Sequence, residues 1–421
     1  MKKSFALSLL FVFSGSLFSF AQKASKTIQI DGKSQHYQLE GIKNRKLGQP
    51  LIILEGDLGA YLENWNRVIL EIEESIPVLA YDRAGLGNSE AREELPTPAN
   101  RTKQLKRLLD ELELAPPYIL VSDGWGAILM NHFAQTYPED IEGMIYIDPM
   151  DKTLSKESMI SIVDREGMDG EKIATDYFNM RRGAFKNAPA EVKGEGEVML
   201  DFFEGKTQDL KLYDFPEIPS VILVGGKHMG YMENPLNPSL GLNYQELLNM
   251  LQLNRIADFT KWVLNSKDSE LVVISNYMHY LHLQEPEKVA SAILSKYYGK
   301  PADRIISASE KYTVGDFEEF LDGLLAYYPE NKIPEPLING LGYDQLRRDQ
   351  PEHAIALFQY NLDRFPDSAN VYDSMGDGLV ALGKAKEAVP YFEKAVEMGE
   401  ISQHSDLELF KKNLANSKVE K

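Results

Sequence analysis

The chain has 421 residues, 43% of them hydrophobic, which is enough for two or three domains with packed cores. Its formal net charge of −19 argues against nucleic acid and anionic membrane surfaces as partners. The absence of cysteine excludes disulfides, thiolate metal sites and a cysteine nucleophile.

Residues 1–21 have the pattern of a cleaved secretory signal peptide. Lys2 and Lys3 form a charged start, an apolar stretch covers 5–20, and Ser19 and Ala21 are the small residues that cleavage requires. An uncleaved membrane anchor is the alternative. The apolar stretch is shorter than the roughly 20 residues of a bilayer span and is interrupted by serines and a glycine. We therefore expect a secreted or periplasmic protein, without membrane insertion after signal cleavage.

Short apolar runs typical of strands follow, separated by helix-like stretches. Runs at 27–30 and 36–40 flank Asp31-Gly32 and indicate an entry hairpin. Six continuous apolar runs suit strands of a parallel sheet covered on both faces: 51–54, 78–81, 118–121, 144–147, 221–224 and 271–274. Their alternation with amphipathic stretches such as 62–73 and 102–114 predicts an α/β fold with a doubly wound, mostly parallel sheet.

Two segments interrupt this alternation. Residues 151–217 are polar and helix-prone, with scattered Met, Tyr and Phe, and predict a helical cap inserted between two strands. Residues 227–265 form a second excursion. It opens with a stretch rich in Gly, Pro and Asn, typical of a loop, and continues with a predicted helix over 244–264.

Beyond residue 300 the pattern is helical only and repeats with a period of 34 residues. Gly342 recurs as Gly376 and Phe358 as Phe392, a spacing of small and aromatic residues that resembles the tetratricopeptide repeat. Two copies are fewer than the three usually needed for stability. We therefore expect residues 313–328 and 406–416 to form flanking helices, or the repeats to dock on the main domain.

Four separated motifs resemble the α/β-hydrolase fold between residues 26 and 300. They are the segments 54–59, 81–89, 121–127 and 279–286. The resemblance implies a hydrolase-like domain over 26–300, with its cap at 151–217, followed by a repeat module over 303–421.

The segment 121–127 has the setting of a nucleophile elbow, in which a strand turns sharply into a helix. The usual pattern is G-x-S-x-G, and here Gly124 occupies the nucleophile position. Glycine reaches strained backbone conformations freely, so it keeps the turn while removing the hydroxyl. The resemblance therefore implies a hydrolase scaffold without its serine nucleophile.

The resemblance also implies the other site residues. His279 falls at the position of the catalytic base, or is a structural imidazole, and His282 is expected to pack nearby. Asp148 is a possible triad acid, although an Asp before Pro149 is also a common structural turn residue. The backbone N–H groups of Trp125 and of the Asp57-Leu58 turn correspond to an oxyanion hole, which could bind a carbonyl or carboxylate ligand.

Two neighbours of Gly124 are candidates for a displaced nucleophile. Asp123 lies one residue before the usual position and Ser122 two residues before it. A shift of one residue at a strand end points a side chain to the other face, which argues against Asp123. Ser122 is expected to face the interior of the sheet. No cofactor is indicated, and His228, His279 and His282 do not form a metal-ligand pattern.

Three functions remain open. The first is a secreted pseudoenzyme that binds a small molecule in the hydrolase-like pocket, with a possible protein partner on the repeats. The second is an active enzyme: either a hydrolase of small ester or amide substrates with a displaced nucleophile, or a lyase-type acid/base catalyst that uses His279. In the third, the hydrolase half is inert and residues 303–421 alone bind the partners.

Overall fold

The computed structural model describes residues 25–418, except for 73, 208–213, 227–234, 238–241, 276–278 and 329. The predicted signal peptide, His228 and most of the loop that opens the second excursion lie outside the described residues. Within the described ranges, no helix is long and apolar enough to cross a membrane.

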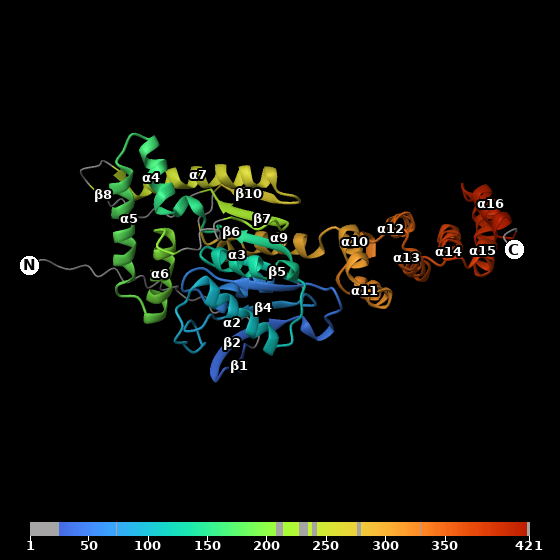
Figure 1. Cartoon of the computed structure of the whole chain (residues 1–421), viewed down its shortest axis with the longest axis horizontal. Helices are drawn as coiled ribbons and strands as arrows, with labels where there is room; N and C mark the ends of the chain where they lie inside the picture. Colours follow the sequence, from blue (N-terminus) through green and yellow to red (C-terminus); the bar gives the residue numbers. More distant parts are fainter. Residues whose placement is uncertain are drawn as a thin grey trace, which may run out of the picture.

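The centre of the molecule is an eight-stranded sheet in the order β1-β2-β4-β3-β5-β6-β7-β10 (Figure 1). Strand β2 pairs antiparallel with both β1 and β4, and every other pairing in this sheet is parallel. The strands are β1 (Lys26–Ile30), β2 (Lys33–Glu40), β3 (Leu51–Glu55), β4 (Val78–Tyr81), β5 (Tyr118–Asp123), β6 (Ile141–Ile147), β7 (Ser220–Gly225) and β10 (Glu270–Ile274). This arrangement confirms the predicted α/β-hydrolase fold.

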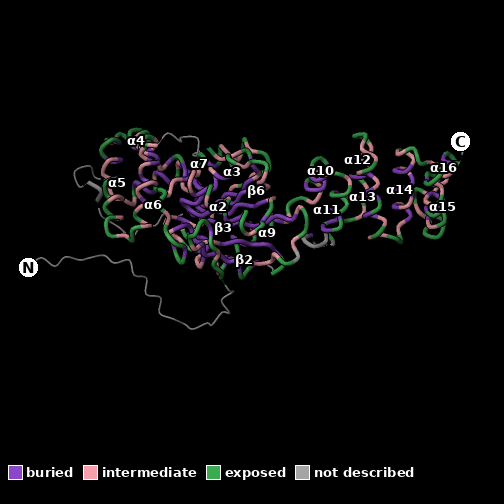
Figure 2. Tube along the Cα trace, turned by 60° about the horizontal axis from the view of Figure 1, so that its bottom comes forward, coloured by how far each residue is buried: buried purple, intermediate pink, exposed green. Residues whose placement is uncertain are grey.

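Helices cover both faces of the sheet, so its inner strands are buried on both sides (Figure 2). Along β3, Ile53 contributes to one hydrophobic core and its neighbour Ile52 to the other, as the two-residue period of a strand requires. The covering helices are α1 (Asn66–Leu70), α2 (Pro98–Glu111), α3 (Gly126–Thr136), α8 (Leu281–Gln284) and α9 (Pro286–Tyr298).

A helical cap lies between β6 and β7, where the sequence predicts one. Its helices are α4 (Lys156–Arg165), α5 (Gly170–Phe185) and α6 (Ala190–Phe203), and they gather at one end of the molecule (Figure 1). The second excursion holds the short strands β8 (Pro235–Asn237) and β9 (Leu242–Asn243) and the long helix α7 (Tyr244–Asn265). Asn243 and Glu246 form a capping box that fixes the start of α7.

An all-helical region follows the sheet domain and extends away from it, on the side opposite the cap (Figure 1). Its helices are α10 (Pro301–Lys311), α11 (Val314–Tyr327), α12 (Glu335–Arg347), α13 (Pro351–Arg364), α14 (Ala369–Ala381), α15 (Ala385–Ser402) and α16 (Leu407–Ser417). One hydrophobic core joins the sheet domain to α10–α13, and Gln49 Nε2 donates a hydrogen bond to Tyr297 Oη at 2.6 Å beside this junction.

Candidate functional site

Four segments meet at the carboxyl edge of the sheet. Asp57 follows β3, Gly124 follows β5, Asp148 follows β6, and His279 lies five residues beyond the end of β10. The carboxyl ends of parallel strands share one edge, which is where open α/β sheets place their sites. The structure therefore brings together the residues that the motifs singled out.

Gly124 forms the tip of a sharp turn between β5 and α3. Its φ of +51° lies in the left-handed region, which glycine adopts without the steric penalty of a side chain. Its N–H donates to Ile147 O at 3.2 Å, and its carbonyl accepts from Met150 N at 3.0 Å. At Gly126, a Cβ would come within 2.7 Å of Gly56 O, so this position also needs a glycine. The turn has the geometry of a nucleophile elbow without the nucleophile.

The side chain of Asp57 fills the space that a residue-124 side chain would need. A Cβ built on Gly124 would lie 2.1 Å from Asp57 Oδ1, far inside van der Waals contact. Trp125 N donates to the same oxygen at 2.6 Å, and the N–H of Leu58 also donates to this carboxylate. The two N–H groups that were expected to form an open oxyanion hole therefore donate to the side-chain carboxylate of Asp57.

His279 bridges Asp57 and Asp148. Its Nε2 lies 3.0 Å from Asp57 Oδ2, and its Nδ1 lies 2.6 Å from Asp148 Oδ2. A carboxylate can only accept, so both ring nitrogens donate when both acids are ionised, and the ring is then an imidazolium. Asp57, His279 and Asp148 form a continuous hydrogen-bonded chain, which we call the acid–imidazole chain.

The electrostatics of the site agree with an ionised chain. Burial lowers the pKa of His279, but hydrogen bonds to Asp148 and Asp57 and their charges outweigh it, so the pKa is raised well above its usual value. Burial likewise works to raise the pKa of Asp57, yet the hydrogen bond and charge of His279 and the two N–H donors lower it overall. Both groups therefore carry their charges near neutral pH.

The two ends of the acid–imidazole chain differ in exposure. The side chains of His279 and Asp57 are 19% and 13% exposed, whereas that of Asp148 is 5% exposed. Arg255, on α7, approaches Asp148 Oδ1 at 3.3 Å and donates to Asp151 Oδ2 at 2.7 Å. Asp148 itself has a φ of +40°. Asp148 therefore lies in a tight turn and its side chain also faces His279 Nδ1 at 2.6 Å, so both interpretations of this residue stay open.

The two neighbours considered as displaced nucleophiles lie elsewhere. Ser122 is fully buried in β5, as expected from its position. Asp123 points toward His282, with 3.3 Å between Asp123 Oδ2 and His282 Nδ1, and burial raises the pKa of Asp123 well above its usual value. His282 packs against the ring of Trp65 at 5.0 Å, which agrees with the packing role expected for it.

A buried ion-pair network supports the turn that carries Asp57. Arg83 donates to Glu55 Oε1 at 2.5 Å, to Asp57 O at 2.7 Å and, through two nitrogens, to Glu195 at 2.7 and 2.8 Å. Glu195 lies on α6 and also accepts from Gly59 N at 3.0 Å. The turn after β3 is therefore tied to the cap. Since the cap sequence contains no recognisable motif, the role of Glu195 was not predictable from it.

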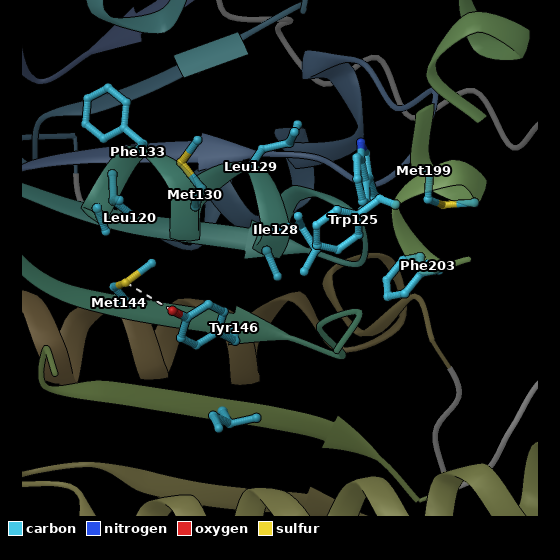
Figure 3. Packing of buried hydrophobic residues seen from close by; sticks show 14 of the residues in the cluster. Leu120, Trp125, Ile128, Leu129, Met130, Phe133, Met144, Tyr146, Met199 and Phe203 are labelled. Carbon is cyan, nitrogen blue, oxygen red and sulfur yellow. Dashed lines mark hydrogen bonds between the residues drawn. The ribbon is translucent and has the colours of Figure 1, made fainter. Parts of the chain in front are cut away.

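The cap also contacts the elbow through aromatic rings. Trp125 is fully buried and meets Phe202 and Phe203 edge-on, at ring distances of 5.8 and 6.2 Å. In Figure 3, Trp125 lies beside Met199 and Phe203 in the same hydrophobic core. Burial lowers the pKa of Arg181, a residue of α5. The charges of Tyr177, Tyr244 and Asp57 outweigh burial, so the pKa of Arg181 is raised overall. Arg181 was likewise missed by the sequence, because nothing around it marks a site.

Among the residues that the structure describes, no three His, Cys, Asp or Glu side chains are grouped so that they could hold a metal ion. The sequence did not lead us to expect that the Asp57 side chain would contact His279 and the turn at Gly124. The available signal for this contact was an acidic residue in the turn after β3 together with a glycine at the elbow.

Over part of its length, the chain is similar in sequence to curated proteins. It is 33% identical to the uncharacterized protein YqjL of Bacillus subtilis over 125 residues, covering 30% of this chain and 47% of that protein. It is 28% identical to an AB hydrolase superfamily protein of Gibberella zeae over 117 residues, 27% of this chain and 36% of that protein. The similarity thus spans less than half of either relative, and no protein-family model matches the chain.

Solved structures are also similar to this chain, at low sequence identity. The haloalkane dehalogenase DbeA-M1 loop variant of Bradyrhizobium elkanii has a TM-score of 0.46 at 14% identity, covering 69% of this chain and 99% of that chain. A hydrolase of Pseudomonas aeruginosa PA01 has a TM-score of 0.41 at 17% identity, covering 65% and 98%.

The order of the sheet and the elbow give the chain the α/β-hydrolase fold. Over part of its length the chain is also similar in sequence to an AB hydrolase superfamily protein.

Proposed function

We propose that this protein does not perform serine-type acyl transfer and instead binds a small molecule at the acid–imidazole chain, as a pseudoenzyme of the hydrolase superfamily. One observation carries the proposal: the carboxylate of Asp57 occupies both the space of the missing side chain at Gly124 and the N–H donors of the oxyanion hole. A substrate oxyanion there would meet a negative charge in place of free donors, which removes the main electrostatic stabilisation of acyl transfer.

Two observations support a ligand site beneath the cap. The end of the acid–imidazole chain formed by Asp57 and His279 is partly exposed, and these two groups offer a fixed pair of opposite charges to a ligand. The cap is anchored to the same turn through Glu195, so a bound molecule would lie against both the sheet domain and the cap.

The repeat module and its protein partner belong to the same proposal. A Cβ on Gly342 would meet the ring of Phe358 at 2.2 Å, and one on Gly376 would meet the ring of Phe392 at 2.4 Å. The same close contact therefore recurs after 34 residues, as expected of a tetratricopeptide-like repeat that presents a binding surface.

Secretion to the periplasm or the extracellular space is also part of the proposal, and it rests on the signal-peptide pattern of residues 1–21.

An active enzyme remains the second candidate, because one contact favours it. His279 Nε2 faces a carboxylate oxygen at hydrogen-bond distance, which is where a base would face the nucleophile it activates. The displaced nucleophile would then be neither Ser122 nor Asp123. A lyase-type role for His279 would use the same contact.

A fluorophosphonate probe, which reacts with activated serines, tests the loss of serine chemistry. We expect the wild-type chain to remain unlabelled. Gly124→Ser alone should also remain unlabelled, because the new side chain collides with Asp57 Oδ1. The double variant Asp57→Gly, Gly124→Ser removes the collision and frees the Trp125 and Leu58 N–H groups, so it should label at the new serine.

Adding His279→Ala to the double variant is the control and should abolish labelling. Labelling of a serine in the wild-type chain, detected by mass spectrometry, would contradict the proposed function. A folded double variant that does not react would contradict the view that only these two positions separate the site from a serine hydrolase.

A further inference from the structure

A large cleft lies at the amino edge of the sheet, where the sheet domain meets α10. Its volume is about 1420 Å³, and side chains of β6, β10, α7, α9 and α10 line it. The acid–imidazole chain lies at the opposite, carboxyl edge, and none of its three residues lines this cleft. Small molecules bind preferentially in concave sites at junctions between domains. The cleft is therefore a candidate site of its own.

Lys296 of α9 reaches the cleft across a glycine of β6. A Cβ built on Gly143 would lie 2.8 Å from Lys296 Cδ and 2.9 Å from its Cγ, so the lysine stem fills the space of the missing side chain. A glycine inside a strand often marks a place where another group approaches the backbone closely. The stem of Lys296 is thus held against the sheet, and the residue is part of the cleft lining.

The amine of Lys296 forms no ion pair with any residue that the structure describes. By contrast, Lys300, four residues further along the chain, pairs with Asp268 at 3.1 Å. Burial lowers the pKa of Lys296, and the positive charge of Lys300 lowers it further. The charges of Glu270, Asp268 and Glu142 do not offset burial, so the pKa stays below that of an ordinary lysine. A partly desolvated lysine beside another cation is an activated amine nucleophile.

A carboxyl group with the opposite perturbation lies near this amine. Glu142 precedes Gly143 in β6, lines the same cleft and pairs with Arg304 at 2.5 Å. Burial raises the pKa of Glu142, and the charges of Arg304 and Lys296 do not offset it. A carboxyl group that retains its proton near an amine that releases its own forms a pair suited to acid–base chemistry.

We propose that Lys296 is a nucleophilic amine that binds a small aldehyde covalently, as an imine, in the cleft at the amino edge of the sheet, with Glu142 as the proton donor. The inference goes beyond the proposed function, because it assigns a second site at the other edge of the sheet. It does not depend on the state of Gly124 or Asp57.

The lining of the cleft favours an uncharged ligand. Acidic and basic side chains are interspersed along it, so it attracts neither anions nor cations strongly. An aldehyde carries no charge and has the electrophilic carbon that an amine attacks. Trp262 and Phe215, whose ring centroids are 5.0 Å apart, also line the cleft and offer an apolar wall to the rest of the molecule.

The reaction needs no oxidant or reductant. The nitrogen lone pair of Lys296 attacks the carbonyl carbon and forms a C–N bond, while the C=O π electrons move to oxygen. A proton then passes from nitrogen to that oxygen and gives a carbinolamine. Glu142 donates a proton to the hydroxyl group, which leaves as water as the nitrogen lone pair forms the C=N bond. The protonated imine returns a proton to Glu142, so amine and aldehyde give imine and water.

Reductive trapping of the full-length chain tests the inference, with benzaldehyde as the probe. Sodium cyanoborohydride reduces an imine to a stable secondary amine, and peptide mass spectrometry measures its rate of formation at each lysine. We expect Lys296 to be modified at least about tenfold faster than Lys300, whose ion pair with Asp268 raises its pKa. Lys300 is the internal control, since both rates come from the same folded protein.

Two variants separate the roles of amine and carboxyl. Lys296→Met keeps an unbranched stem over Gly143 and should remove the fast modification without changing that of Lys300. Glu142→Gln still offers an oxygen to Arg304 and should slow imine formation at Lys296 by at least about tenfold. It should not slow acetylation of the same amine by acetic anhydride, because that reaction loses no water. Circular dichroism would establish that each variant is folded.

If Lys296 of the folded wild-type protein reacts no faster than Lys300, the inference is wrong. Equal slowing of both reactions in Glu142→Gln would show that Glu142 only shapes the cleft, which would overturn its role as proton donor. Neither result bears on the proposed function, which is tested at the opposite edge of the sheet by the fluorophosphonate probe.

Discussion

At the scale of single residues, Gly124 and Asp57 depend on each other. With any larger side chain at position 124, the Asp57 carboxylate could not occupy its present position, since even a Cβ would lie 2.1 Å from Oδ1. With Asp57 in place, the elbow must remain a glycine. Because each residue depends on the other, a serine at position 124 should require that Asp57 be replaced as well.

The pKa of His279 should depend strongly on Asp148. Replacing Asp148 by Asn keeps a side chain of the same shape but removes the negative charge beside Nδ1 at 2.6 Å. We expect the pKa of His279 to fall by about one unit or more. The protonated ring stabilises the fold below its unfolded pKa, and this contribution is lost as the pH rises through the raised folded value. In the variant, this contribution should be smaller and its loss should be complete at a lower pH. Titration of the His279 ring by NMR measures the shift.

Asp151→Asn is the matched control for that titration. Asp151 also pairs with Arg255, at 2.7 Å, but does not contact His279. It should leave the pKa of His279 unchanged to within a few tenths of a unit. An equal shift in both variants would mean that Arg255, rather than the direct hydrogen bond, controls the imidazole.

The sequence was sufficient to locate the site in the fold, but it was not sufficient to assign a role to each residue in the site. The motifs placed Gly124 and His279 after strands that end at the same edge of the sheet, whereas Asp148 was open as a triad acid or a structural turn residue. They did not predict that the Asp57 side chain would turn inward, since that depends on space left by a Cβ that is absent 67 residues further along the chain. Arg181 and Glu195 act through the packing of the cap, which no local pattern encodes.

At the scale of elements, continuous apolar runs predicted the inner strands of the central sheet, because burial on both faces leaves that signature. Strands β1 and β2 were predicted as a hairpin around Asp31-Gly32. The expectation that the run at 271–274 is covered on both faces was wrong, because β10 is an edge strand and Val272 and Val273 are exposed. Helix limits were less predictable. The stretch expected as one helix over 62–73 is a 3₁₀ turn at Leu62–Trp65 followed by α1, which ends at Leu70. The long helix expected over 244–264 agrees closely with α7, whose capping box is visible in the sequence.

The attachment of α16 to α14 should depend on pH. Asp373 of α14 accepts from Asn413 of α16 at 3.1 Å, and burial, followed by the charge of Asp377, raises the pKa of Asp373 to about 7. The folded chain therefore holds this proton over a range in which the unfolded chain releases it. Stability should fall as the pH rises from about 4 to about 7, by up to roughly 1.4 kcal/mol per pH unit, and level off above.

Calorimetry between pH 4 and 8 measures this dependence. Asp373→Asn keeps a neutral group facing Asn413 and should flatten the dependence across that window. Asp363→Asn, at an exposed position of α13, should leave it as in the wild type. If Asp373→Asn retains the full slope, the buried carboxyl is not its source.

At the scale of the whole molecule, the helical region shares a core with the sheet domain. Phe320 of α11 is buried in that shared core and lies against Gly48, just before β3. Arg304 of α10 reaches Glu142 of β6 at 2.5 Å. The first helices of the module thus complete the sheet domain and are not a free appendage.

Truncating Phe320 should therefore destabilise the sheet domain as well as the helices. We expect Phe320→Ala to lower the stability of the whole molecule by about 3–5 kcal/mol, through lost burial and an unfilled cavity. Phe410→Ala removes an equally buried ring from the distal cluster around α15 and α16, and should affect only the last helices. Calorimetry, with limited proteolysis to identify the domain that unfolds first, distinguishes the two. Unfolding confined to the helices in both variants would contradict the shared core.

The helices join the domain at the opposite pole from the acid–imidazole chain. Gly48 and Glu142 mark the amino ends of β3 and β6, while Asp57 and Asp148 follow the carboxyl ends of the same strands. Under the proposed function, a protein partner bound along α12 to α16 would lie on the opposite side of the sheet domain from the cap. That partner and a small molecule at the acid–imidazole chain could then be bound at the same time.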